Sequence, residues 1–149
     1  MSMTEIPASL LLDKIARAAA GRYASSIARL GLRPKHVGLL AAVAALHHPS
    51  QADIGSWLGV GPSAVVALVD EGIHLGIVNR EQDNDNRRRA RIELTEAGRS
   101  QQAAAFDVAQ QLDDELMTGM SAEERAAFLG TLLRLGAKLG IGRGEESTD

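Results

Sequence analysis

The sequence predicts a mainly helical protein with a small β-wing, in which N- and C-terminal helices flank a winged helix-turn-helix. Its 149 residues are rich in Ala and Leu, and aromatic residues make up 3% of them, a composition that favours helices. Apolar positions recur every three or four residues through most of the chain, which is the period of an amphipathic helix. Residues 77–94 instead contain two short β-prone runs around a polar, arginine-rich segment.

Glycine, proline and capping residues divide the N-terminal half into helices. Apolar residues spaced as on one helix face predict a first helix over residues 5–30. Pro34 suits the first turn of a second helix over 34–46, whose dense apolar content indicates burial. Ser50 is a good N-cap for a third helix over 51–58.

The centre of the chain has the element order of a winged helix-turn-helix. The turn at 59–61 leads to a fourth helix that begins at Pro62 and stops at Gly76. Two strands are expected next, over 77–81 and 89–94. Such a unit places the second helix of the pair in the DNA major groove and the wing along the backbone or the minor groove.

The C-terminal part is again helical. Thr95 caps a fifth helix that is expected to end near Thr118, and Ser121 with Glu124 forms a capping box for a sixth helix that ends near Leu139. We therefore expect one domain over 1–149, with a DNA-binding part at 34–95, a helical dimerisation part at 5–31 and 96–140, and a disordered tail at 142–149.

Composition and motifs exclude several classes of protein. The chain has no cysteine, which excludes disulfides and thiol-based sensing. No apolar run is long enough to cross a bilayer and the N-terminus lacks a signal-peptide pattern, so we expect a cytoplasmic protein. Phosphate-binding glycine loops and nucleophile motifs do not occur, and we expect neither an enzyme nor a cofactor. The four histidines lack ligand spacing and are expected at the surface or at helix C-termini, so no metal site is predicted.

The distribution of charge is more informative than its sum. The formal net charge of −3 does not by itself favour nucleic acid. Residues 86–91, with the sequence NRRRAR, nevertheless hold four arginines and no acid. Arg87, Arg88 and Arg89 are therefore the strongest candidates for contacts with DNA. A solvated turn is the alternative interpretation of this run.

The terminal helices have wide apolar stripes that a small winged-helix unit covers only in part. The expected partner for the remaining apolar surface is a second copy of the chain, so we predict a homodimer with a twofold helical interface. The alternative is a monomer in which these helices cap the central unit.

Six segments in order carry a resemblance to a known family: LGLRPKHVGLLAAV, SQADIGSWLGV, PSAVVALVDE, LGIV, DNDNRRR and LTEAGR. Together they resemble the MarR family of bacterial transcriptional regulators over nearly the whole chain. The resemblance implies a homodimer, in most members a repressor, that binds a pseudo-palindromic operator. It also implies release from DNA by a small aromatic or phenolic acid bound between the dimerisation and DNA-binding parts.

The resemblance assigns DNA contacts to the exposed side of the fourth helix, but this chain departs from the family there. The helix contains no Arg, Lys, Asn or Gln, the residues that make bidentate hydrogen bonds with bases. Each such contact that is absent removes about 1–3 kcal/mol of discrimination between the correct base and a wrong one. We therefore expect binding dominated by phosphate and minor-groove contacts. A winged-helix dimer that has lost specific DNA recognition, and serves as a protein-interaction or ligand-binding module, is the alternative. The expected contact positions on this helix are Pro62, Ser63, Ala64, Val66 and Ala67.

Three further positions depart from the family. Glu71 places a carboxylate near the DNA phosphates, where it lowers affinity. Asn86 stands where the family's Asp holds a following arginine, so we expect a looser wing unless a nearby Asp substitutes. Gly72 replaces a core Leu, and we expect it either to open space near the ligand cleft or to be compensated by Ile73.

An effector cleft is expected where the first and second helices and the start of the fifth meet the DNA-binding part. Ordinary core and interface positions are the alternative for the residues in this region. Trp57 is expected to be a partly buried packing residue, with effector stacking as its alternative. An aromatic acid needs a cation, a donor and apolar walls, which Arg22, Tyr23, His36 and Leu40 would supply.

Overall fold

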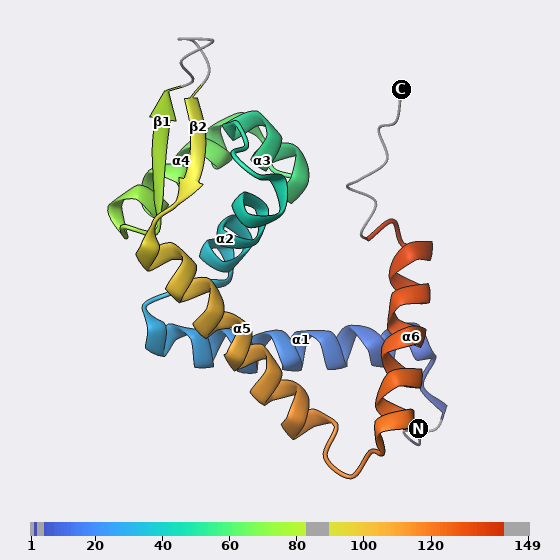
Figure 1. Ribbon diagram of the computed structural model, residues 1–149. Helices are drawn as coiled ribbons and strands as arrows, with labels where there is room; N and C mark the ends of the chain where they lie inside the picture. Colours follow the sequence, from blue (N-terminus) through green and yellow to red (C-terminus); the bar gives the residue numbers. More distant parts are fainter. Residues whose placement is uncertain (1, 3–4, 83–89, 142–149) are drawn as a thin grey trace. The chain divides into compact units, whose positions relative to one another are not determined.

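The computed structural model describes residue 2, residues 5–82 and residues 90–141 (Figure 1). Within these residues it is mainly helical with one two-stranded sheet, so the predicted fold class is confirmed. The elements are α1 (Ala8–Ile27), the short 3-10 helix η2 (Ala28–Leu30), α2 (Pro34–Leu46), α3 (Gln51–Leu58), α4 (Pro62–His74), β1 (Val78–Gln82), β2 (Ala90–Leu94), α5 (Glu96–Leu116) and α6 (Ala122–Lys138).

The chain forms two compact units, Met1–Leu112 and Asp113–Asp149. The first unit contains the elements from α1 to β2 and most of α5, and the second contains the end of α5 and all of α6. The helix-turn-helix and the described part of the wing therefore belong to the first unit.

The core of the first unit forms around α2, which packs against α3, α4 and β2. Apolar residues at helical spacing turn inward from each of these helices, as the sequence pattern predicted. Fully burying a Leu, Ile or Val side chain contributes about 1.5–3 kcal/mol. The largest fully buried side chains are Ile27, Leu39, Leu40, Ile54, Val65, Val69, Ile77, Val78 and Ile92.

The predicted helix starts are confirmed by their capping hydrogen bonds. The Oγ of Ser50 accepts from the Asp53 N–H at 3.1 Å, and the Asp53 carboxylate accepts from the Ser50 N–H at 2.9 Å. Ser121 forms the same kind of box at the start of α6. Thr95 accepts from the Gly98 N–H at 2.9 Å, which caps α5.

The two strands form an antiparallel pair in which Val78 lies opposite Leu94 and Arg80 lies opposite Ile92. The first strand begins one residue later than predicted, because the N–H of Ile77 still bonds to the carbonyl of Gly72 at the end of α4. Residues 83–89, which join the strands, lie outside the described residues.

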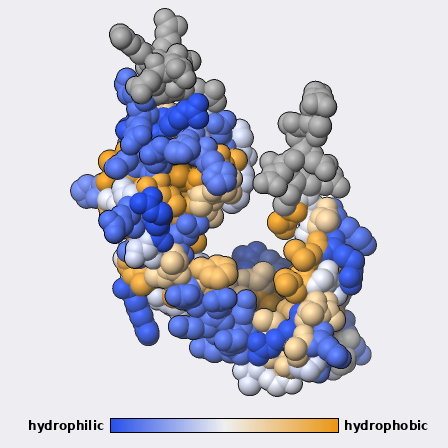
Figure 2. Space-filling model, in the orientation of Figure 1, coloured by the Kyte–Doolittle hydropathy of each residue, from blue (hydrophilic) through white to orange (hydrophobic). Residues whose placement is uncertain are grey.

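The second unit holds α6 by polar contacts with the end of α5. Arg125 pairs with Asp114 at 3.0 Å and donates to the carbonyl of Met117 at 3.3 Å. No residue of α6 is buried. Figure 2 shows hydrophobic residues at the surface of this helix; the large ones are Phe128, Leu129, Leu132, Leu133 and Leu135.

Among the described helices, none is on its own both long and apolar enough to cross a membrane; α3 and α4 pass that test only together, as a pair bent by 109°. The described residues also contain no group of three or more His, Asp or Glu side chains that could hold a metal ion.

Candidate nucleic-acid interface

α4 is anchored along one side and exposed along the other. Val65, Leu68 and Val69 recur at helical spacing and are buried in the core. Pro62 begins the helix, where its missing N–H leaves no hydrogen bond unmade. The five positions expected to contact DNA all lie on the exposed side: Pro62, Ser63, Ala64, Val66 and Ala67.

The turn before α4 fixes how the helix is presented. Gly59 ends α3 with φ of 69°, in the left-handed region that glycine adopts without strain. The Val60 N–H then bonds back to the Gly55 carbonyl at 2.9 Å. A side chain at position 55 would place its Cβ 3.1 Å from the Val60 carbonyl oxygen, so the tight turn favours glycine there.

A groove of about 580 Å³ lies between α3 and the start of α4. Val60 and Val66 border it and are each 40% exposed. Gln51, Ala52 and Ser56 line it from α3. The surface beside the N-terminal half of α4 is therefore mainly apolar, with methyl groups from Ala52, Val60 and Val66.

Arg80 of β1 ties the wing strand to both helices of the helix-turn-helix. Its Nη2 donates to the Asp70 carboxylate at 3.0 Å and to Oε1 of Gln51 at 2.7 Å. The Asp70 carboxylate on the exposed side of α4 is therefore paired with a cation. The same contacts hold the start of the wing beside α3 and α4.

Glu71 is also paired. Its carboxylate accepts from Nζ of Lys35 at 2.8 Å and lies 3.0 Å from Nε2 of His36. The hydrogen bond from Lys35 and then the one from His36 lower the pKa of the Glu71 carboxyl. The sequence predicted that this carboxylate lowers affinity for DNA; in the structure, the lysine beside it offsets its negative charge.

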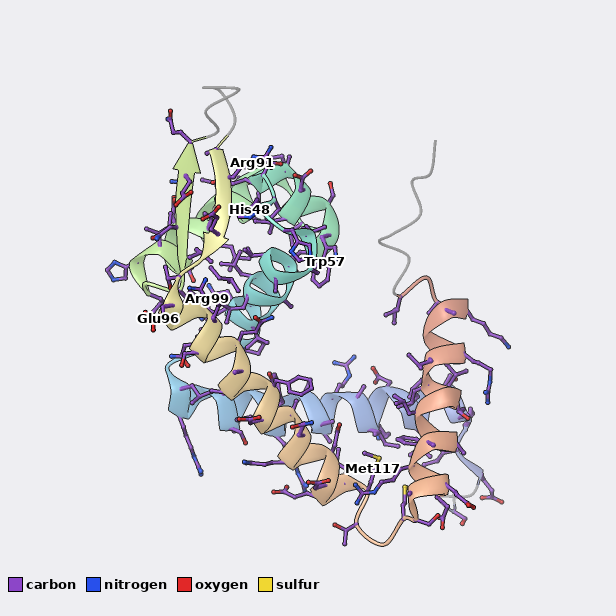
Figure 3. The ribbon with its side chains drawn as sticks, viewed as in Figure 1. His48, Trp57, Arg91, Glu96, Arg99 and Met117 are labelled. Carbon is purple, nitrogen blue, oxygen red and sulfur yellow. The ribbon has the colours of Figure 1, made fainter. Side chains whose placement is uncertain are left out.

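The described part of the wing carries one of the four arginines of the basic run. Arg91 is exposed on β2 and donates to the His48 carbonyl at 3.3 Å (Figure 3). The His48 ring pairs with Glu93 on the same strand. Arg87, Arg88 and Arg89, and Asn86 before them, lie outside the described residues, so their predicted role stays a prediction.

Solved structures share this fold over most of the chain. A crystal structure of MarR covers 97% of this chain and 98% of its own length, with 25% identity and a TM-score of 0.79. The chain has the fold of the MarR family. A MarR-family transcriptional regulator from Silicibacter pomeroyi covers 93% of this chain and 96% of its own, with 26% identity and a TM-score of 0.68. A mutant MarR from E. coli, complexed with operator DNA, covers 87% and 94%, with 18% identity and a TM-score of 0.71, and so shows the fold alone.

A curated relative supports the same assignment. The chain is 30% identical over 83 residues to the "Uncharacterized HTH-type transcriptional regulator YwhA" of Bacillus subtilis (strain 168). The match spans 56% of this chain and 60% of YwhA, which is less than two thirds of that relative. No family model matches the chain. The predicted resemblance to MarR is confirmed, and the fold is that of transcriptional regulators rather than of an enzyme.

Within the MarR fold, the four residues expected to line an effector cleft have different environments. Arg22 is exposed on α1, whereas Leu40 has no exposed surface. The Tyr23 hydroxyl donates to the Ala105 carbonyl at 3.2 Å, and burial raises its pKa. His36 is 5% exposed and its Nδ1 accepts from the Arg33 N–H at 3.0 Å, so the expectation that it is a surface or C-terminal histidine is wrong. Effector binding by these residues stays a prediction.

Gly72 does not open space in this MarR fold. A Cβ at this position would lie 2.7 Å from Leu39 Cδ2 and 2.8 Å from Val78 Cγ2, because those two side chains fill the volume. Ile73 does not compensate either, since it is 37% exposed. Both expectations for Gly72 are therefore wrong, and its absent side chain lets α2 and β1 approach α4.

Sequence reasoning missed three residues that contact the candidate interface: Lys35, Gln51 and Arg80. Lys35 and Arg80 neutralise the two carboxylates on α4, and Gln51 completes the contact with Arg80. Lys35 and Glu71 are 36 positions apart, so helical periodicity does not connect them. The one available signal was charge, because adjacent carboxylates at 70 and 71 attract nearby cations.

Proposed function

We propose that this chain is a DNA-binding transcriptional regulator that acts as a homodimeric repressor on a pseudo-palindromic operator. The observation that carries the proposal is α4, whose buried side is fixed in the core while its N-terminal half is exposed. A helix held in this way can enter the major groove without unfolding its support.

The comparisons support DNA as the partner. MarR of the same fold has been crystallised with operator DNA, and YwhA is named as an HTH-type transcriptional regulator. In the proposed complex, Arg87, Arg88 and Arg89 contact phosphates or the adjacent minor groove. Phosphate contacts supply affinity that is independent of sequence.

The apolar surface supports a dimer. On α1, Leu10 and Ile15 are 55% and 53% exposed, and on α6, Leu133 is 66% exposed. Exposed apolar residues gathered on helices commonly mark protein–protein contacts. A twofold dimer would present two copies of α4 to successive major grooves.

A second candidate has an observation of its own. α4 contains no Arg, Lys, Asn or Gln, and its exposed N-terminal half is mostly apolar. Such a surface would also suit a winged-helix dimer that binds a protein or a small ligand and has lost operator recognition.

Titration of random duplex DNA at two salt concentrations separates the two functions. A regulator that neutralises several phosphates loses affinity as salt rises, with a log–log slope of about −0.9 per phosphate contact. An interaction module shows little binding at either salt, and that result would contradict the proposal.

The matched variants are Arg88→Ala in the wing and Arg134→Ala on α6. Arg88→Ala should weaken binding to all sequences and, because a twofold dimer carries two copies of Arg88, reduce the salt slope by about two contacts, whereas Arg134→Ala should leave both unchanged. Selection of bound duplexes from a random pool then gives the half-site spacing.

An effector is part of the proposal at the level of chemical class. Trp57, the single tryptophan, is 40% exposed on α3 and serves as a fluorescent reporter (Figure 3). Addition of benzoate or 4-hydroxybenzoate should change its emission and release DNA. An unchanged emission together with retained DNA would argue against a small aromatic acid as effector.

A further inference from the structure

We infer that α4 reads thymine by contact with its C5-methyl group, and not guanine or adenine by hydrogen bonds. The inference rests on the proposed function, because it specifies which base feature a DNA-binding α4 recognises. It applies to the contacts of α4 with base edges in the major groove, and not to the contacts of the wing.

The side chains that meet a base edge are set by the geometry of α4. In a helix-turn-helix the N-terminal residues of the second helix contact the bases. After Pro62, the exposed positions here are Ser63, Ala64, Val66 and Ala67. Three of the four end in methyl groups, and Val66 also borders the groove between α3 and α4.

The groove extends the apolar surface beyond the helix. Val60 and Val66 are each 40% exposed at its border, and Ala52 continues it on α3. Thymine is the one standard base that places a methyl group in the major groove, and small apolar side chains are its usual contacts. The occupant that fits this surface in a DNA complex is therefore a thymine methyl group.

Polar readout by the same helix is restricted by contacts that already exist. A free carboxylate could accept from the cytosine amino group. Asp70 is instead engaged by Arg80 at 3.0 Å, and Glu71 by Lys35 at 2.8 Å. The Ser63 hydroxyl remains, but a hydroxyl both donates and accepts and so discriminates little between bases.

The expected size of the effect follows from the area that one methyl group removes from water. Burial of one such group corresponds to about a fourfold change in affinity. Two methyl contacts in each half-site of a twofold operator would multiply this factor and yield a measurable preference for thymine.

The test replaces single thymidines by deoxyuridine in a duplex selected from a random pool. Deoxyuridine keeps base pairing and removes only the methyl group. We expect the affinity to fall about fourfold at one or two positions in each half-site and to stay unchanged outside them. Replacement of guanine by 7-deazaguanine, which removes the N7 acceptor, should leave affinity unchanged.

A pair of variants assigns the contact to the N-terminal half of α4. Val66→Ala should bring the thymidine-to-deoxyuridine affinity ratio at one position close to one. Ile73→Ala is the matched control, because Ile73 is 37% exposed at the other end of the same helix. It should leave the ratio as in the unsubstituted protein.

The outcomes separate this inference from the proposed function. Equal affinity for thymidine and deoxyuridine duplexes, or a loss of affinity with 7-deazaguanine, would overturn methyl readout while DNA binding stands. Absence of binding to any duplex would overturn the proposed function and the inference with it.

Discussion

Glu71 joins α2 to α4 at the edge of the proposed DNA surface. Its carboxylate receives hydrogen bonds from Lys35 and His36 at the start of α2. The Nδ1 of His36 accepts a hydrogen bond from the Arg33 N–H, so the ring proton lies on Nε2. The Nε2–H then donates a hydrogen bond to the Glu71 carboxylate. One carboxylate thereby anchors α4 and completes the cap of α2.

A pH dependence follows from this contact. Because the folded pKa of Glu71 lies below its ordinary value, the contact stabilises the fold above the ordinary glutamate pKa, and that stability is lost as pH falls through the lowered pKa. Glu71→Gln should therefore be less stable than the unsubstituted protein at pH 7, with a difference that shrinks in acid. Urea denaturation at several pH values measures this difference. Asp107→Asn, at an exposed position of α5, is the control; an equal pH effect in both variants would contradict the assignment.

Gly98 of α5 lies directly against the backbone of Ile77. A Cβ at this position would lie 1.9 Å from the Ile77 carbonyl oxygen, a backbone atom that cannot move aside without disturbing the start of β1. Gly98→Ala should therefore lower the free energy of unfolding by about 3 kcal/mol or more. Gly21→Ala is the matched control in α1, where a Cβ meets no atom within 4 Å, and it should gain about 0.5–1 kcal/mol. Denaturation midpoints of the two variants on opposite sides of the unsubstituted value would confirm the close contact, whereas two similar shifts would refute it.

At the scale of elements, the signals that could be read from the sequence are local. Ser50, Pro62 and Ser121 mark helix starts because each acts on groups within one turn, and the structure confirms all three. The environment of Gly72 could not be read in this way. Leu39 of α2 and Val78 of β1 fill the space beside it. A single sequence does not show which residues of two separate elements come to lie opposite each other.

Arg80 links β1 of the wing to α3 and α4. Arg80→Met removes the contacts with Asp70 and Gln51, and should speed hydrogen exchange of the β1 amides and lower the free energy of unfolding by about 0.2–1 kcal/mol. It should also weaken DNA binding, because Asp70 then carries an unpaired charge near the phosphates. Arg17→Met, which breaks a pair with Asp13 on α1, is the control and should leave exchange in β1 unchanged. Unchanged exchange in the Arg80 variant would show that the contacts with Asp70 and Gln51 do not hold the wing strand.

Over the whole molecule, the apolar stripes of the terminal helices predict that the chain has a partner, and large apolar side chains of α1 and α6 are exposed in the single chain. The sequence could not predict which residues contact each other across such an interface. An apolar stripe shows which face of a helix is buried, but many different apolar surfaces can pack against it. Leu133 and Leu129 are 66% and 57% exposed on α6, and a helix with no buried residue has little to stabilise it in water by itself.

The homodimer can be tested at α6. Leu133→Glu places two charges in a twofold interface, where each buried Leu contributes about 1.5–3 kcal/mol, so the dimer dissociation constant should rise at least about a hundredfold. Sedimentation equilibrium over a concentration series measures this constant. Leu75→Glu, at a 43% exposed position just after α4, should leave it unchanged. If the unsubstituted chain sediments as a monomer at every concentration, the dimer is wrong, and DNA binding would then have to come from one copy of α4, with half the salt slope that a twofold complex predicts.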